Sequence, residues 1–448
     1  MNKTKIICTL GPSSYDKETL RKLIHSGLNV ARFNFSHAEY EQSRILIQNI
    51  KDLNKELKSY VGFILDTKGP EIRTHQFDGL VSIKKNSLVK IYSEEVLGNC
   101  EGFSVTYKDF YKEINVGNMI YVDDGYLSLE VIDKDLAKKE LITRAKNDHN
   151  LKSRRGINVP NVKFNIDFIS PKDYHDILFA IEEDYDYIAA SFVRSAKDIQ
   201  DIKNILKENK NDRIQIIAKI ENQEGIDNLD EIIDISDGIM VARGDLGIEI
   251  PGEKVPLYQT KIIFQCLLKG KIVVVATQML ESMQKNPHPT KAEISDVFNA
   301  VREGTVATML SGESASGDYP IESVQYMSKI NYQAEKNLDS YFLSHIYQPQ
   351  NSREYLLLSV VEIAFRLNAK AIIVDNFQDA YNISKFHPSV CVLALLSDLK
   401  EASLLSLSFS IIPILNQEEL NKKISFLKNK NDNYFLLVKK QTMELKIL

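Results

Sequence analysis

Short apolar runs alternate with amphipathic stretches along the first three quarters of the chain. Eight of these runs are rich in Ile, Val, Ala and Phe, which is typical of strands buried on both faces. They cover 5–9, 28–35, 61–67, 187–193, 215–221, 238–245, 271–278 and 305–312. Most are followed by a periodic segment such as 17–27, which predicts a helix. Eight units of strand then helix predict an α/β fold, a closed (β/α)8 TIM barrel.

Polar and ionisable residues end nearly all of these runs. They are Arg32, Asn34, Ser36, Asp66, Lys219, Glu221, Arg243, Asp245, Thr277, Gln278, Ser311 and Glu313. In a parallel barrel the carboxyl ends of the strands meet at one mouth, where active sites lie. A doubly wound open sheet is the alternative, although it would not gather all eight strand ends at one mouth.

The pattern of hydrophobic and polar positions changes at two places along the chain. Between the third and fourth runs, stretches such as 88–93 and 119–124 alternate with period two around turns, which predicts a small inserted β-barrel domain. Because it follows a barrel strand end, it should stand over the mouth as a lid. After about residue 338, helices and strands continue without polar strand ends. The predicted domains are the barrel (1–69 and 168–337), the lid (70–167) and a C-terminal α/β domain (338–448).

Composition narrows the class of protein. The net charge is −5, and no block of five or more like charges offers a surface for nucleic acid or a membrane. Four cysteines lie far apart, without the spacing of a disulfide framework or a metal site. The N-terminus leads directly into a strand, and no apolar run reaches the roughly 18 residues of a membrane span. We therefore expect a cytoplasmic protein.

Charged residues at two neighbouring strand ends indicate phosphoryl chemistry. Lys219 and Glu221 share one strand face, and Asp245 ends the next strand. Two carboxylates suit Mg²⁺, and a lysine beside the metal can neutralise a phosphoryl group. The glycine at Gly244 exposes backbone N–H groups at a predicted helix start, which favours a carboxylate ligand. A structural network of ion pairs is the alternative interpretation.

Two further strand ends carry candidate ligands. Arg32, Asn34 and Ser36 are two apart and point the same way, with His37 in the following turn. Without a ligand they would form a solvated rim. Thr277 ends the seventh run, where it could also be an ordinary buried threonine. The sequence contains no GxxxxGK[ST] loop, so a nucleotide would be held in another way.

Seven motifs resemble the pyruvate kinase family, and the resemblance covers nearly the whole chain. They are CTLGPSS (8–14), ARFNFSH (31–37), LDTKGPEIRT (65–74), KIENQEG (219–225), ARGDLGIEIP (242–251), ATQMLESM (276–283) and LSGESASGDYP (310–320). The resemblance implies transfer of the phosphoryl group of phosphoenolpyruvate to ADP, giving pyruvate and ATP, the final step of glycolysis. It also implies Mg²⁺ (or Mn²⁺), K⁺ and a homotetramer.

The resemblance implies a role for each motif residue. Lys219 would stabilise the phosphoryl group in transfer, and Arg32 would meet the phosphate of the substrate. Glu221 and Asp245 would hold Mg²⁺. The backbone of Gly244 and Asp245, together with Thr277, would bind the substrate carboxylate, with Thr277 near the enolate carbon.

The nucleotide and the monovalent cation follow from the same resemblance. Nucleotide binding would use Asn34, His37, Arg73 and Arg155, and K⁺ would bind Asn34, Ser36, Asp66 and Thr67. K⁺-independent relatives carry a lysine in place of Glu71, and its ammonium stands in for the ion. Because this chain has a glutamate that lacks such a partner, we expect K⁺ activation.

Three positions depart from the family pattern. Arg155 stands where relatives have a lysine, and keeps the charge but not the shape. Ser316 replaces a lysine near an expected subunit contact. The stretch 371–388 lacks the Ser/Thr-Gly loop that cradles an effector phosphate, so regulation by fructose bisphosphate is not expected.

Two other functions stay open at this point. A metal-dependent aldolase or lyase acting on pyruvate enolate would use the same carboxylates, but would not need Arg73, His37 or the lid. A non-enzymatic paralogue is the second alternative. The intact set of Lys219, Glu221, Asp245 and Thr277 argues against it.

Overall fold

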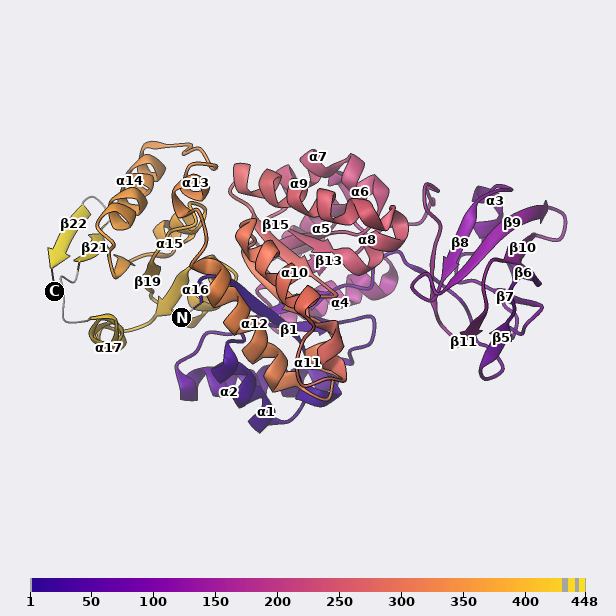
Figure 1. Cartoon of the computed structure of the whole chain (residues 1–448), viewed down its shortest axis with the longest axis horizontal. Coiled ribbons are helices and arrows are strands. Elements are labelled where there is room, and N and C mark those ends of the chain that lie inside the picture. The colour runs from indigo at the N-terminus through magenta and orange to yellow at the C-terminus, as the bar shows by residue number, and fades with distance from the viewer. Residues whose placement is uncertain (1, 429–433, 440–442, 448) are drawn as a thin grey trace.

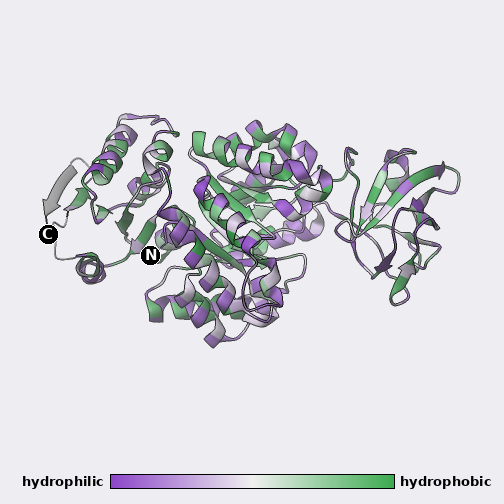
Figure 2. Ribbon diagram, viewed as in Figure 1, coloured by the Kyte–Doolittle hydropathy of each residue, from purple (hydrophilic) through white to green (hydrophobic). Residues whose placement is uncertain are grey.

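A closed parallel barrel forms the centre of the computed structural model, which describes residues 2–428, 434–439 and 443–447. Its strand order is β1-β17-β16-β15-β14-β13-β3-β2, so the predicted TIM barrel is confirmed. The strands are β1 (Lys5–Thr9), β2 (Val30–Asn34), β3 (Gly62–Asp66), β13 (Tyr187–Ala190), β14 (Gln215–Ile220), β15 (Gly238–Ala242), β16 (Ile272–Ala276) and β17 (Ala307–Leu310). Figure 2 shows these strands as hydrophobic, as burial on both faces requires.

Helices surround the barrel, and several begin at side chains that cap them. Asp16 accepts a hydrogen bond from the Thr19 N–H, and Ser170 and Thr290 each begin a capping box. The helices are α1 (Lys17–Ser26), α2 (Tyr40–Leu57), α4 (Pro171–Glu182), α5 (Ala196–Glu208), α6 (Gln223–Asp227), α7 (Leu229–Ile235), α8 (Arg243–Glu249), α9 (Val255–Leu268), α10 (Lys291–Arg302), α11 (Gly312–Ala315) and α12 (Pro320–Glu335), with 3₁₀ turns η1 (Pro12–Ser14), η2 (Gly252–Lys254) and η3 (Glu281–Gln284).

The insert after β3 is a separate β unit that stands off the barrel (Figure 1). Its elements are β4 (Ile72–Arg73), β5 (Val81–Ile83), β6 (Leu88–Tyr92), β7 (Gly102–Ser104), α3 (Phe110–Glu113), β8 (Met119–Val122), β9 (Leu127–Asp135), β10 (Glu140–Ala145), β11 (His149–Leu151) and β12 (Gly156–Asn158). The strands form a seven-stranded sheet, β4-β12-β8-β9-β10-β6-β7, and a β11-β5 pair. The alternation of hydrophobic and polar residues predicted these strands, but it does not determine which strands pair with each other in each sheet.

The C-terminal part is a five-stranded sheet with helices on it. Its elements are α13 (Ser340–Ser344), α14 (Ser352–Arg366), β18 (Ala371–Val374), α15 (Phe377–Ser384), β19 (Cys391–Leu395), α16 (Leu399–Leu404), β20 (Ile411–Ile414), α17 (Gln417–Leu427), β21 (Tyr434–Val438) and β22 (Met443–Ile447). The order is β20-β19-β18-β21-β22, with β22 antiparallel. Asp379, in the first turn of α15, pairs with Arg353, so this helix start already contains a carboxylate. The domain limits at 70, 168 and 338 stay predictions.

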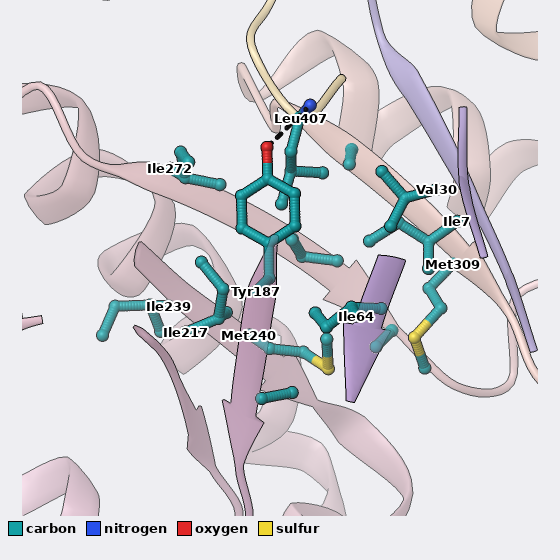
Figure 3. Close-up of a cluster of buried hydrophobic side chains, with 14 of the residues drawn as sticks. Ile7, Val30, Ile64, Tyr187, Ile217, Ile239, Met240, Ile272, Met309 and Leu407 are labelled. Atoms are coloured by element: carbon teal, nitrogen blue, oxygen red, sulfur yellow. Dashed lines mark hydrogen bonds between the residues drawn. The ribbon is translucent and has the colours of Figure 1, made fainter. Parts of the chain in front are cut away.

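A C-terminal segment closes the floor of the barrel, at the amino ends of its strands. The Tyr187 hydroxyl on β13 donates to the Leu404 carbonyl at 2.6 Å and accepts from the Leu407 N–H at 3.2 Å. Leu407 and Phe409 belong to the same buried cluster as the barrel strands, as Figure 3 shows for Leu407. At the start of β1, Lys5 donates to the Ile411 carbonyl at 2.6 Å. Leu407 and Phe409 therefore extend the barrel core, while the C-terminal sheet also has buried clusters of its own.

Replacing Tyr187 with phenylalanine is expected to lower the free energy of unfolding by about 1–3 kcal/mol, because two buried backbone groups lose their partner. Urea unfolding of the purified chain measures this change. Tyr185→Phe is the matched control, because the buried Tyr185 hydroxyl has no hydrogen-bond partner among the described residues. A Tyr187→Phe chain as stable as the Tyr185→Phe chain would contradict this account of the barrel floor.

Candidate active site

The Lys219 ammonium is held by three partners at the carboxyl end of β14. It lies 3.0 Å from Asp66 Oδ1, 2.6 Å from Ser191 Oγ and 3.0 Å from Glu221 Oε1. Burial alone would lower the pKa of Lys219, but the carboxylates of Asp66 and Glu221 together outweigh it and raise this pKa above its ordinary value. Lys219 is therefore a fixed positive charge, held by two hydrogen bonds and one further ion pair.

Asp66 joins two cations beneath the mouth. Its Oδ2 accepts a hydrogen bond from Arg32 Nε at 2.6 Å, and its Oδ1 accepts from Lys219. Burial would raise the pKa of Asp66, but the charges of Arg32 and Lys219 lower it below its usual range. Arg32 also donates to Thr9 Oγ1 at 2.8 Å. The sequence placed Asp66 among oxygen ligands only, whereas the structure also makes it the counter-ion of both basic side chains.

The carboxylates of Glu221, just after β14, and Asp245, on α8, lie near enough for their charges to interact. Burial, with the nearby Asp245 charge adding to it and Lys219 opposing it, raises the pKa of Glu221 to about 7. Burial is also the main reason that the pKa of Asp245 is raised. The Asp245 carboxylate has no hydrogen-bond or ion-pair partner among the residues that the structure describes. A bound cation would relieve this repulsion, so the pair fits a hard divalent ion.

Protein ligands alone do not complete a metal site here. Within residues 2–428, 434–439 and 443–447, no group of three or more His, Cys, Asp or Glu side chains is arranged to hold a metal ion. Mg²⁺ is commonly bound through one or two carboxylates, with substrate oxygens and water as the other ligands. The pair of Glu221 and Asp245 matches that pattern.

Thr277 follows β16 in a left-handed backbone conformation, φ +65°, which is rare for a β-branched residue. Its hydroxyl accepts from the Gly244 N–H at 2.8 Å and donates to the Ala276 carbonyl at 2.6 Å. Arg243 stabilises this turn, because it donates to the Thr277 carbonyl at 2.7 Å and pairs with Asp296. Strained backbone of this kind concentrates at functional sites.

Two clefts meet at Asp245. One, of about 530 Å³, lies between the barrel mouth and the insert, and His37, Arg73 and Arg155 line it together with Asp245. The other, of about 730 Å³, is lined by Gly244, Thr277 and again Asp245. The structure thus brings together three of the four predicted nucleotide residues and, separately, the predicted carboxylate site.

Asn34, the fourth nucleotide candidate, lies with the predicted K⁺ ligands. β2 pairs with β3 so that Asn34 is opposite Asp66. The Asn34 side-chain oxygen accepts from the Ser36 N–H at 3.1 Å, and Thr67 Oγ1 accepts from the Ser191 N–H at 3.1 Å. Side chains with oxygen atoms therefore end both neighbouring strands, β2 and β3.

The expectation that Glu71 lacks a cationic partner was wrong. Its Oε1 accepts from Arg73 Nε at 2.6 Å, and Lys68 Nζ lies 3.8 Å away. Both partners are separated from Glu71 by only two or three positions. Both residues can be read from the sequence, but only the structure shows that their side chains converge on Glu71.

Ser191 and Thr9 were missed as site residues. Each closes a barrel strand, Ser191 just after β13 and Thr9 at the end of β1. The rule that selected Lys219 and Asp66, a polar residue at the end of an apolar run, would also have selected both. Only the contacts show that Ser191 lies on Lys219 and Thr9 on Arg32.

Comparison with known proteins shows the family to which the chain belongs. The profile "Pyruvate kinase, barrel domain" matches residues 1–324. The chain is 44% identical over 423 residues to a pyruvate kinase of Bacillus licheniformis and 45% identical over 425 residues to one of Staphylococcus haemolyticus, in each case over 93% of this chain and 72% of the relative. A solved structure, a pyruvate kinase from Cryptosporidium parvum, is similar with a TM-score of 0.91 and 37% identity, over all of this chain and 96% of that one.

Proposed function

Because the chain belongs to the pyruvate kinase family, we propose that it transfers the phosphoryl group of phosphoenolpyruvate to ADP, giving pyruvate and ATP in the last step of glycolysis. The observation that carries the proposal is the arrangement around Lys219. A buried ammonium pairs with two carboxylates near Arg32 and Asp245, and among the described residues the Asp245 carboxylate has no hydrogen-bond or ion-pair partner. This concentration of opposite charges suits a reaction in which a phosphoryl group moves between two anions.

The proposed role of each residue follows from its charge and from where its side chain or backbone N–H lies at the mouth of the barrel. Lys219 neutralises negative charge on the transferring phosphoryl oxygens. Arg32 binds the substrate phosphate while Asp66 holds its guanidinium in place. Thr277 and the backbone N–H groups of Gly244 and Asp245 receive the substrate carboxylate, with the Thr277 hydroxyl near the carbon to be protonated.

Glu221 and Asp245 would hold Mg²⁺ or Mn²⁺, which acts as a Lewis acid on the phosphoryl oxygens when bound. Support comes from the burial of both carboxylates, which is the main cause of their raised pKa and which a bound cation would offset. His37, Arg73 and Arg155 would bind ADP in the cleft below the insert, and Asn34, which does not line that cleft, would contribute from the end of β2. Closure of that insert would exclude water and so favour transfer over hydrolysis.

We expect K⁺ bound by Asn34, Ser36, Asp66 and Thr67 to raise the turnover rate at least about tenfold, which is ~1.4 kcal/mol in activation free energy. Glu71→Lys should retain activity without K⁺, because its ammonium supplies the missing positive charge. Rates measured in K⁺ and in tetramethylammonium buffers compare the two chains. Equal rates of the unmodified chain in both buffers would contradict the proposal.

Helix α9 supports the proposed homotetramer. Leu257, Phe264 and Leu268 on its outer side are 65%, 44% and 41% exposed, and the helix lies on the outer surface of the barrel (Figure 1). Apolar side chains on one exposed helix face favour a subunit contact. Sedimentation is expected to give four copies of the 51.1 kDa chain, and a stable monomer would contradict this.

Among the described helices, none combines the length and the apolar character that a membrane span needs. We further propose a cytoplasmic location.

Pyruvate formation from phosphoenolpyruvate and ADP with Mg²⁺ tests the proposed reaction. The purified chain is expected to turn over both substrates in K⁺ buffer. Absence of turnover with and without K⁺ would reject the reaction. In that case the binding-protein alternative would gain support.

A further inference from the structure

The residues that follow β13 hold both charged side chains of the neighbouring strand β14. Ser191 Oγ lies 2.6 Å from Lys219 Nζ, and the Phe192 N–H donates to Glu221 Oε2 at 2.6 Å. β13 and β14 are adjacent and parallel, with Ala190 opposite Ala218, so these contacts continue the ladder beyond its last paired residues. One short segment therefore sets the position of both side chains.

The Ser191 hydroxyl is held in one orientation. It is 2% exposed and donates its single proton to Asp66 Oδ1 at 3.0 Å, so that only lone pairs are left to face Lys219. The Ser191 N–H donates to Thr67 Oγ1 at 3.1 Å. Gly69, at φ +70°, lies so close that a Cβ on it would be 2.7 Å from the Ser191 carbonyl oxygen. The serine is thus a fixed and directional acceptor.

Phe192 adds an independent observation. Its φ is +56°, a left-handed conformation that is unusual for a bulky residue. Such strain persists only where surrounding contacts impose it, and it concentrates at functional sites. Here the conformation directs the Phe192 N–H at the Glu221 carboxylate, and Phe192 also lines the cleft below the insert.

We propose that Ser191 is a positioning residue for phosphoryl transfer, acting through Lys219. A lysine ammonium sits on a flexible four-carbon stem, and the carboxylates of Asp66 and Glu221 attract it without fixing its direction. The neutral Ser191 hydroxyl supplies the third direction and adds no charge that would weaken Lys219 as a cation. This inference rests on the proposed function, because it assigns Ser191 to the same reaction.

Three substitutions test the hydroxyl. Ser191→Ala removes it, Ser191→Cys replaces it with a thiol of similar volume that accepts hydrogen bonds weakly, and Ser191→Thr keeps it. Ser323→Ala is the matched control, because Ser323 is equally buried and, among the described residues, its hydroxyl bonds only to the carbonyl of Tyr319, which precedes helix α12. kcat, KM for both substrates and the melting temperature are measured for each chain with Mg²⁺ and K⁺.

The Ala and Cys chains are expected to lose about 30-fold in kcat, the effect of a charge-assisted hydrogen bond, with KM for phosphoenolpyruvate changed less than about threefold. Ser191→Thr should recover most of that loss, and Ser323→Ala should match the unmodified chain in kcat. A Ser191→Cys chain that folds and keeps kcat within about twofold would overturn the inference, as would losses in kcat matched by Ser323→Ala. An unmodified chain without turnover would instead overturn the proposed function, and this inference with it.

Discussion

Lys219→Met is expected to lower kcat by about 10³-fold, because the reaction loses a preorganised positive charge next to the transferring phosphoryl group. The fall should exceed that of a simple lost contact. Glu221 and Asp66 lie 3.0 Å from the ammonium in the intact chain and would be left to repel an incoming anion. Pyruvate formation from phosphoenolpyruvate and ADP, followed at saturating Mg²⁺ and K⁺, measures the effect.

Lys5→Met provides the control for Lys219→Met. Lys5 is also a buried lysine on a barrel strand, but its ammonium donates to the Ile411 carbonyl at the opposite end of the barrel. This substitution should change stability and leave kcat within about twofold, because Lys5 is remote from the mouth. A Lys219→Met chain that kept more than about a tenth of the activity would contradict the proposed role of the lysine.

Asp245→Asn is expected to weaken binding of Mn²⁺, used as a spectroscopic substitute for Mg²⁺, by about 10²-fold. The amide keeps the shape of the side chain but supplies a neutral oxygen, so that Glu221 is left as the single carboxylate facing the ion. Free Mn²⁺ in a titration is measured by electron paramagnetic resonance. That measurement is independent of turnover, and the Mg²⁺ concentration for half-maximal rate should rise in parallel.

Glu249→Gln is the matched control for Asp245→Asn. Glu249 lies one helical turn further along α8, and its carboxylate accepts from Asn158 Nδ2 at 2.8 Å instead of facing Glu221. We expect Glu249→Gln to bind Mn²⁺ within about threefold of the unmodified chain. Equal Mn²⁺ affinity in the Asp245→Asn chain and the unmodified chain would mean that the ion is held elsewhere.

Local pattern predicted the barrel and the outline of its site. Apolar runs of five to eight residues followed by 3.6-period segments are properties of consecutive residues, and they specified strands such as β3 and β14 within a residue or two. Because parallel strands align their carboxyl ends, the polar residues that follow those runs had to share one mouth. That reasoning predicts Lys219, Glu221 and Asp245 as candidate site residues at this mouth.

Pairing between distant residues was decided only by the tertiary structure. Asp66 and Lys219 are 153 positions apart and Asp66 and Ser191 are 125 apart, so no local pattern links them. The same holds for the barrel floor, where Tyr187 binds the backbone of Leu407, 220 positions away. The period of the hydrophobic positions determines which face of a helix or strand is buried. Which side chains meet, which charge balances which, and where the backbone is strained depend on how the elements are packed against each other.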